Sequence, residues 1–232
     1  MEKKVTTILV TGANRGIGLE FVRQYASDGA DIIACCRKPA EARQLHALAK
    51  SGKVRVMALD VGEASSAAAL AQALRGEAID ILINNAGVFG PEKRSDSESY
   101  YEEFARTFRT NSIGPLIVSQ ALRDNLTRGH DKKLAVLTSK MGSISDSSTG
   151  AIAYRASKAA LNMIMHVLAR EWAGDGIQVA ILHPGWVKTD MGGPGALITP
   201  QESVRGLRAR IAELNAQTSG RYLDYQGKEI AW

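Results

Sequence analysis

The chain has 232 residues, of which 45% are hydrophobic and 23% are charged, and its formal net charge is +5. This composition argues against a collagen-like, low-complexity or largely disordered protein, and the length suits one domain over residues 1–232 that buries roughly 70% of its unfolded surface. The basic residues are scattered and follow no zinc-finger, helix-turn-helix or aromatic-basic pattern, so we expect anionic small-molecule ligands and no nucleic-acid partner.

Cysteine, histidine and apolar-run patterns exclude several further classes of protein. Cys35 and Cys36 are the two cysteines, and neighbouring side chains on a strand point to opposite faces, so we expect no disulfide between them. The four histidines have no metal-ligand spacing, and we expect no metal site. The sequence has no apolar run of 18 residues and no signal-like apolar start, so we expect a cytoplasmic protein without membrane contact.

Short β-branched and aliphatic runs alternate with longer helical patterns along the chain. Strands are predicted over Thr6–Thr11, Asp31–Cys36, Val54–Leu59, Ile79–Asn84, Leu134–Ser139, Gln178–His183 and, at the sheet edge, Arg221–Leu223. Helices are predicted over Gly16–Ser27, Ala40–Ser51, Ala64–Leu74, Ser97–Thr127 with a break at Gly114-Pro115, Ala153–Ala173 and Pro200–Leu214. The alternation predicts an α/β fold: a single Rossmann-type doubly wound parallel sheet of about seven strands, flanked by helices on both faces.

A glycine-rich loop follows the first predicted strand. It reads T-G-A-N-R-G-I-G from Thr11, with glycines at Gly12, Gly16 and Gly18. Such a loop lets the backbone approach a pyrophosphate at the N-terminus of the next helix, although a glycine-rich turn without a ligand is the alternative. The pattern G-x-x-x-x-G-K-[ST] is absent, which disfavours hydrolysis of nucleoside triphosphates.

The end of the second predicted strand bears on the choice of dinucleotide. An acidic residue at this corner selects NAD, whereas an arginine accommodates the 2′-phosphate of NADP. Here the corner reads Cys36-Arg37-Lys38, and Arg15 is expected to project toward it from the glycine loop. We therefore predict NADPH rather than NADH as the preferred cofactor, with solvated side chains in an ordinary loop as the alternative reading of Arg37 and Lys38.

Tyr154 and Lys158 are four residues apart, so they share one face of the predicted helix. An ammonium beside a phenol favours the tyrosinate, and moving a phenol pKa from about 10 to about 7 requires roughly 4 kcal/mol. A tyrosine tuned in this way can donate a proton to a carbonyl oxygen or accept one from an alcohol. The alternative is an exposed pair on an ordinary helix.

Four motifs in order resemble the short-chain dehydrogenase/reductase family: T-G-A-N-R-G-I-G, N-N-A-G, Y-R-A-S-K and H-P-G-W-V-K-T. The ending Y-x-G-K-E-I-A-W further resembles the branch of sniffer-type carbonyl reductases and C-factor signalling proteins. The resemblance implies hydride transfer between NADPH and a small carbonyl or alcohol substrate. A C-factor-like signalling protein, in which dinucleotide binding matters more than turnover, is the alternative. A hydrolase is disfavoured because no candidate serine lies in G-x-S-x-G.

The resemblance also implies roles for individual residues. Ser139 would hydrogen-bond the carbonyl oxygen, with Ser143 as the alternative because Ser139 lies 15 positions before Tyr154, slightly more than is common in the family. Asn111 would hold a water that links Lys158 to solvent, or else bond a helix kink. His183 is interpreted as a strand-end residue rather than a base.

Cofactor contacts are implied for residues at the ends of five strands. With Arg37, Tyr154 and Lys158, the set comprises Gly12, Asn14, Arg15, Gly16, Ile17, Gly18, Asp60, Val61, Asn85, Ala86, Gly87, Pro184, Gly185, Val187 and Thr189. The substrate is expected to be bordered by Met141, Ser145, Trp186, Met191 and Ala196. Pairing through the helices predicted over Ser97–Thr127 and Ala153–Ala173 would give a homodimer or homotetramer.

Overall fold

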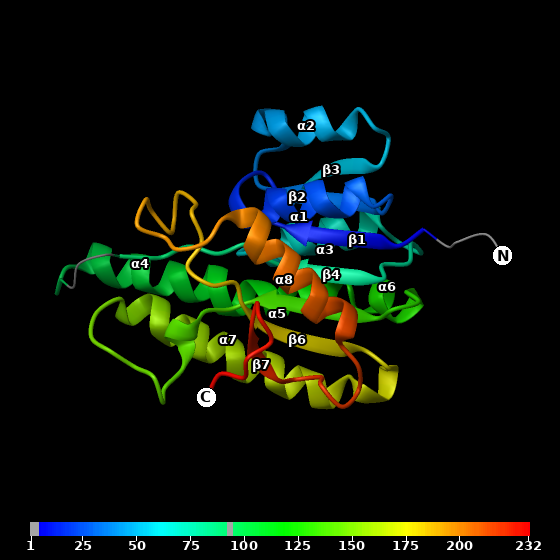
Figure 1. Cartoon of the computed structure of the whole chain (residues 1–232). Coiled ribbons are helices and arrows are strands. Elements are labelled where there is room, and N and C mark those ends of the chain that lie inside the picture. Colours follow the sequence, from blue (N-terminus) through cyan, green and yellow to red (C-terminus); the bar gives the residue numbers. More distant parts are fainter. Residues whose placement is uncertain (1–4, 92–94) are drawn as a thin grey trace.

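Seven parallel strands form the centre of the structure, a computed structural model that describes residues 5–91 and 95–232 (Figure 1). Their order across the sheet is β3-β2-β1-β4-β5-β6-β7. The strands are β1 (Thr7–Thr11), β2 (Asp31–Cys36), β3 (Val54–Ala58), β4 (Ile81–Asn84), β5 (Lys133–Leu137), β6 (Gln178–His183) and β7 (Tyr222–Asp224). The predicted Rossmann-type doubly wound sheet is confirmed.

The strand order reverses at β1. This strand pairs with β2 on one side, where Val10 is opposite Ala34, and with β4 on the other, where Val10 is opposite Ile83. Strands β2 and β3 therefore lie on one side of β1, and strands β4 to β7 lie on the other side. The loops that leave the carboxyl ends of β1 and β4 diverge at this point, which is where ligands bind in open parallel sheets.

Side-chain alternation along the strands creates two separate cores. In β1, Ile8 and Val10 pack in one core, whereas Leu9 packs in the other. The first core lies under α1 (Gly16–Ser27), α2 (Arg43–Ala49) and α8 (Pro200–Glu213). The second core lies under α3 (Ala64–Ala73), α5 (Gly114–Ala121), α6 (Arg123–Arg128) and α7 (Ile152–Glu171). Helices consequently cover both faces of the sheet, as a two-residue side-chain period requires.

The helix predicted over Ser97–Thr127 is present, but it divides at other points than the expected Gly114-Pro115. The structure has α4 (Glu98–Phe108), a π-helical turn over Arg109–Ile113, then α5 and α6. The expected break at Gly114-Pro115 is replaced by the π-helical turn just before it, in which the N–H of Gly114 bonds the main-chain oxygen of Arg109. Pro115, which has no N–H to donate, lies in the first turn of α5.

Two other predicted elements are shorter than expected. Residues 40–51 form a 3₁₀ turn (Pro39–Glu41) and then α2, because Ala42 leaves the helical region with ψ of 60°. Strand β5 ends at Leu137, two residues before Ser139, so the catalytic candidate lies in the following loop. This displacement frees the Ser139 side chain from the sheet.

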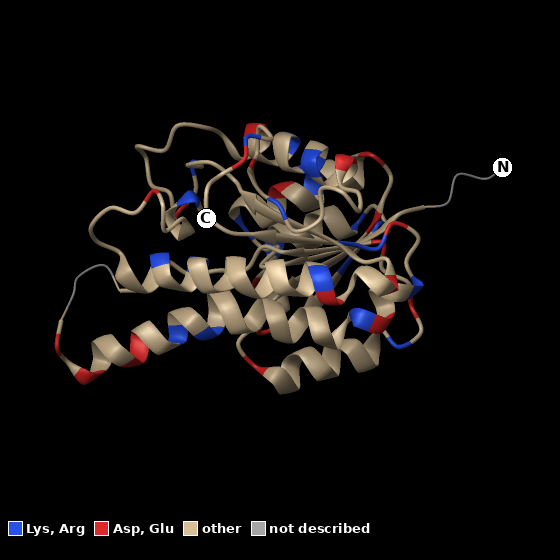
Figure 2. Ribbon diagram, turned by 90° about the horizontal axis from the view of Figure 1, so that it is seen from below, with Lys and Arg blue, Asp and Glu red and all other residues tan. Residues whose placement is uncertain are grey.

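Charged side chains are interspersed over the helices. Figure 2 shows Lys and Arg as well as Asp and Glu scattered over several elements on this side of the molecule, in agreement with the scatter seen in the sequence. Cys35 and Cys36 are buried free thiols on opposite faces of β2. Over the described ranges, no helix is long and apolar enough to cross a membrane, and no three His, Cys, Asp or Glu side chains are grouped to hold a metal.

Close backbone packing at Gly129 generates a stability prediction. A Cβ at this position would lie 2.1 Å from the main-chain oxygen of Ile79, so Gly129→Ala should lower the free energy of unfolding by about 2 to 3 kcal/mol in urea titrations. Gly174→Ala is the control, because a Cβ there meets no atom within 4 Å. Equal stability of the two variants would contradict the packing described here.

Candidate active site

Asn85 joins the glycine loop to the carboxyl end of β4. Its Nδ2 donates to the main-chain oxygens of Thr11 (2.8 Å) and Gly12 (3.1 Å). In return, the Thr11 hydroxyl oxygen accepts from the main-chain N–H groups of Asn85 (3.0 Å) and Ala86 (3.1 Å). The loops at the switch point are therefore one hydrogen-bonded unit. Thr11 was missed as a site residue, and its only sequence signal is its place before Gly12.

Two glycines allow this close approach. Gly12 has φ of +62°, and a Cβ at Gly18 would lie 2.4 Å from the Gly12 main-chain oxygen. The N–H of Ala13 donates to the main-chain oxygen of Cys35 at 3.0 Å, which braces the loop against β2. The glycine spacing predicted a backbone-lined loop, and the contacts show why each position excludes a side chain.

The first turn of α1 opens from this loop. Arg15 is its N-cap residue, and in the described part of the chain no side-chain hydrogen bond caps the turn. The free N–H groups and the positive end of the helix dipole suit a phosphate. Asn14 is exposed beside them, whereas Ile17 packs against the core.

The two arginines of the predicted NADPH corner point in different directions. Arg37 is exposed directly after β2, and no ion pair joins it to another described residue. Arg15 was expected at the same corner, but its guanidinium instead lies 2.9 Å from the Asp190 carboxylate in the loop after β6. The opposite charge of Asp190 attracts it. Both side chains of the pair are exposed, so it contributes at most about 1 kcal/mol and can exchange with another anion.

Asp60 and Val61 lie at the carboxyl end of β3. An Asp60 carboxylate oxygen accepts from the N–H of Gly62 at 3.0 Å, which fixes the turn, and Val61 is buried. The main-chain oxygen of Val61 faces Gly114, where a Cβ would approach it to 2.9 Å. The predicted adenine-side residues therefore pack against the start of α5.

Lys158 is almost fully buried where α7 passes the ends of β4 and β5. Its Nζ donates to the main-chain oxygen of Leu137 at 2.8 Å, and burial lowers its pKa to about 8. Gly87 lies beside it: a Cβ there would be 3.7 Å from this Nζ and 3.3 Å from Oδ1 of Asn111. The structure thus brings together the N-N-A-G motif, Asn111 and the lysine, as predicted.

Tyr154 is half-buried one helical turn before Lys158. Its ring stacks on Phe89 with centroids 4.9 Å apart. Burial raises the pKa of Tyr154, while the neighbouring Ser139 hydroxyl lowers it. We expected Lys158, supplemented by the nicotinamide ring, to lower this pKa; its Nζ is 5.7 Å from the ring centroid and is bonded to Leu137. With burial as the larger influence, the pKa of the phenol is above its ordinary value and the phenol is protonated at neutral pH.

The two candidate serines differ in their partners. Ser139 begins a 3₁₀ turn over Lys140–Gly142, and its Oγ accepts from the N–H of Met141 at 3.2 Å while facing Tyr154. The Ser143 hydroxyl instead donates to the main-chain oxygen of Ala231 at 2.6 Å. This geometry favours Ser139 over Ser143 as the serine beside the tyrosine.

Asn111 occupies the π-helical turn and is fully buried. Its Nδ2 donates to the Val88 main-chain oxygen (2.8 Å) and to the Ser157 hydroxyl (3.0 Å), and its Oδ1 accepts from the Val88 N–H (2.9 Å). Both amide hydrogens therefore have protein acceptors. The side chain fixes the loop after β4, which is the structural role considered as the alternative, and the water relay stays a prediction.

The segment after β6 closes over the glycine loop. Thr189 lies 3.4 Å from the position of a Cβ at Gly16, and the Ser203 hydroxyl donates to the Pro184 main-chain oxygen at 2.6 Å. Gly185 has φ of +84°. Burial lowers the pKa of His183 to about 4, which agrees with a neutral strand-end residue.

The residues expected to border the substrate are only partly accessible. Trp186 and Met191 are exposed, and the Trp186 Nε1 donates to the Gly192 main-chain oxygen at 2.8 Å, whereas Ala196 is buried. Ser145 is exposed, and its hydroxyl donates to the Trp232 main-chain oxygen at 2.5 Å. Met141 lies between these groups, half-buried after Ser139.

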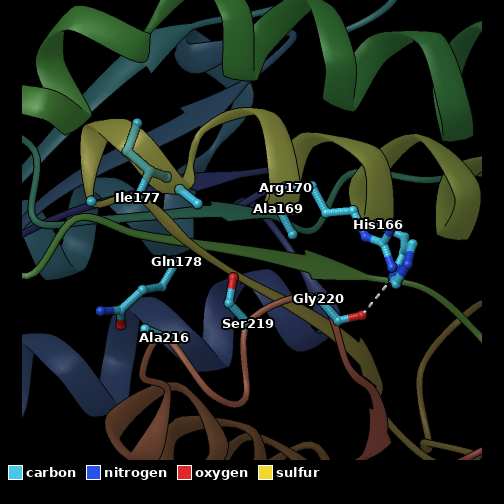
Figure 3. Close-up of a pocket in the computed structure, with 10 residues that line it drawn as sticks. His166, Ala169, Arg170, Ile177, Gln178, Ala216, Ser219 and Gly220 are labelled. Atoms are coloured by element: carbon cyan, nitrogen blue, oxygen red, sulfur yellow. Dashed lines mark hydrogen bonds between the residues drawn. The ribbon is translucent and has the colours of Figure 1, made fainter.

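Two cavities among the described residues lie elsewhere. One of about 360 Å³ borders Gln178, at the amino end of β6, and Figure 3 shows His166 and Gly220 on its wall. Another of about 730 Å³ borders Thr6 and Lys133, at the amino ends of β1 and β5. The predicted site residues converge at the opposite, carboxyl edge of the sheet.

Comparison with known proteins agrees with this geometry. The family model for short chain dehydrogenases matches residues 6–195. The chain is 45% identical over 155 residues to the C-signal of Myxococcus xanthus, covering 66% of this chain and 93% of that protein. The structure is similar to NADPH-bound carbonyl reductase from chicken fatty liver (35% identity, TM-score 0.91) and to the carbonyl reductase Sniffer of D. melanogaster (27%, 0.89); each covers 99% of this chain and 100% of the other.

The fold and the match to the family model define an oxidoreductase of the short-chain dehydrogenase type. The chain belongs to the short-chain dehydrogenase/reductase family, and its relatives include both branches that the sequence indicated, C-signal proteins and sniffer-type carbonyl reductases.

The buried ammonium of Lys158 yields a pH-dependent stability prediction. Its folded pKa is below the ordinary lysine value near 10.4, so the unfolded chain binds more protons between pH 8 and pH 10.4 and stability rises with pH in that window. The free energy of unfolding of Lys158→Met should therefore exceed that of the wild type by about 2 to 4 kcal/mol at pH 7. This difference should shrink as the pH approaches 10.

Urea unfolding at several pH values measures this difference. Lys50→Met, at an exposed position, is the control and should change stability little at any pH. A Lys158→Met protein that is less stable than the wild type at pH 7 would contradict the cost assigned to this buried charge.

Proposed function

We propose that the protein is an NADPH-dependent reductase of small ketones or aldehydes in which Tyr154 is the general acid. The observation that carries the proposal is that Ser139 lies near enough to Tyr154 to lower the pKa of its phenol, while the buried Lys158 lies one helical turn further along α7. The similarity to a carbonyl reductase described as NADPH-bound supports the cofactor and the reaction class.

The glycine loop fits a dinucleotide. It is a cradle that a Cβ would fill at Gly12 or Gly18, and it leads to the uncapped N–H groups of α1. These groups would hold the pyrophosphate, Arg37 the 2′-phosphate, and Asp60 and Val61 the adenine side. The nicotinamide supplies the hydride when bound, and the protein supplies orientation and electrostatics.

The proposed proton transfer uses the chain's own residues. Because its pKa is raised, the Tyr154 hydroxyl holds its proton at neutral pH and can donate it to a carbonyl oxygen. The Ser139 hydroxyl is placed to donate a hydrogen bond to the same oxygen as negative charge develops there. Lys158, beside Gly87, would bond the nicotinamide ribose, and Asn111 would keep the loop after β4 in place.

Assembly, domain organisation and location remain predictions. Large apolar side chains are exposed on the helices expected to pair, notably Tyr101 on α4 and Met163 and Val167 on α7, which supports a homodimer or homotetramer. Light scattering tests this, and a strict monomer would contradict it. A single domain over residues 1–232 and a cytoplasmic location are retained as proposals.

A signalling role is the second candidate, favoured by the 45% identity to C-signal. Following NADPH absorbance with a panel of aldehydes and ketones separates the two candidates. Saturable consumption supports the reductase, whereas dinucleotide binding without turnover of any compound favours signalling.

Replacing Tyr154 tests the general acid. Tyr154→Phe keeps the ring that stacks on Phe89 but removes the proton donor, so NADPH affinity should be unchanged while kcat falls about 10²- to 10⁴-fold. Tyr101→Phe, on the exposed face of α4, is the control. Turnover by Tyr154→Phe at the wild-type rate would overturn the assignment.

Arg37 generates the cofactor prediction. A charge-assisted contact with the 2′-phosphate contributes about 2 to 3 kcal/mol, so kcat/KM should favour NADPH over NADH by roughly 30- to 150-fold. Arg37→Ala should erode this ratio, and combining it with Cys36→Asp should reverse it. Arg43→Ala removes a nearby exposed charge and should leave the ratio unchanged. Equal use of both cofactors by the wild type would defeat the prediction.

A further inference from the structure

Tyr222 in the edge strand β7 contacts the turn that carries Ser139. Its side chain is 1% exposed, and its hydroxyl donates to the Ser139 main-chain oxygen. We propose that Tyr222 is a positioning residue that sets where the Ser139 hydroxyl stands relative to Tyr154. This inference rests on the proposed reductase function and assigns it a residue outside the recognisable motifs.

Ser139 needs such a support because the sheet does not hold it. The β5–β6 ladder ends at Leu137, and the last ladder-like bond is from the N–H of Thr138 to the Leu182 main-chain oxygen, at 2.8 Å. Beyond it, the Ser139 main-chain oxygen accepts from the N–H of Gly142 at 2.8 Å within its own turn. Tyr222 supplies the second donor to this oxygen, and it comes from outside the turn.

Helix α7 packs against the turn that carries Ser139. A Cβ at Gly142 would lie 2.8 Å from the main-chain carbon of Lys158, so the turn packs directly on the helix that carries the catalytic pair. One turn along α7, Asn162 Oδ1 accepts from the Thr138 hydroxyl at 2.6 Å, and its Nδ2 donates to the Gly142 main-chain oxygen at 3.4 Å. The turn is therefore clamped between α7 and the phenol of Tyr222.

The Tyr222 hydroxyl keeps its proton and is held in place by its neighbours. Burial raises the pKa of Tyr222 to about 12, so it keeps its proton wherever the enzyme is folded and active. Strand pairing places it, because Tyr222 is opposite Ile181 of β6. The ring of Trp232 packs beside it with centroids 5.4 Å apart, and the main-chain oxygen of Trp232 accepts from the N–H of Ser145 at 2.9 Å.

Helix α7 anchors the same segment. His166 Nδ1 lies 3.1 Å from the Gly220 main-chain oxygen, the contact drawn in Figure 3, and the His166 ring meets that of Trp232 edge-on. The Ser143 hydroxyl adds its bond to Ala231. Residues 220–232 thus contact residues 139–145, which we call the serine turn, at Ser139, Ser143 and Ser145.

The test is a double-mutant cycle between Tyr222 and Ser139. Tyr222→Phe keeps the buried ring and removes the donor, so kcat for carbonyl reduction should fall about tenfold while the NADPH dissociation constant is unchanged. In a Ser139→Ala background the same substitution should lower kcat less than twofold, because the group that it positions is already gone. Tyr101→Phe serves as the tyrosine-to-phenylalanine control.

Two outcomes would overturn the inference: Tyr222→Phe with kcat within twofold of the wild type, or the full tenfold loss persisting in Ser139→Ala. If Tyr222→Phe does not fold, Ser143→Ala takes its place, with an expected loss of a few-fold in kcat that again disappears in Ser139→Ala. Failure of the proposed function looks different, since the wild type would then bind the dinucleotide without consuming it in the presence of any carbonyl compound.

Discussion

The buried ammonium of Lys158 is the constraint around which the site is arranged. A charge removed from water must be compensated, and here a single main-chain oxygen, that of Leu137, accepts from it at 2.8 Å. Helix α7 can pass this close to the turn after Ser139 because residue 142 is a glycine, where a Cβ would lie 2.8 Å from the main-chain carbon of Lys158. The same approach brings Tyr154 and Ser139 together, so packing and chemistry are set by one contact region.

Much of the fold follows from local sequence patterns. Strands β2 and β6 begin and end where the sequence predicts, because their apolar runs are continuous and bounded by turn residues. In the helix over residues 97–127, the position of the interruption was mispredicted for a non-local reason. Its π-helical turn places Asn111 against the main chain of Val88, 23 positions earlier, and helical periodicity carries no trace of that contact.

In the candidate site, too, some residues could be predicted from local sequence and others could not. Residues that would perform chemistry lie in short motifs, so Tyr154, Lys158 and Ser139 could be predicted to converge at the carboxyl ends of the strands. Residues that hold them cannot be found so easily: Thr11 and Asn162 act through main-chain or amide contacts that many sequences could make. Arg15 shows the complementary error, since a flexible exposed side chain takes whichever opposite charge is nearest, here that of Asp190.

The contact between Tyr222 and Ser139 has a consequence for biosynthesis. The two residues are separated by 83 positions in the sequence, and Ser143 is separated by 88 positions from its partner Ala231. A ribosome releases the glycine loop, β4 and α7 well before β7, so a nascent chain acquires its dinucleotide-binding half while the serine turn is still unsupported. The contacts of Ser139 with Tyr222 and of Ser143 with Ala231 are therefore among the last to form during synthesis.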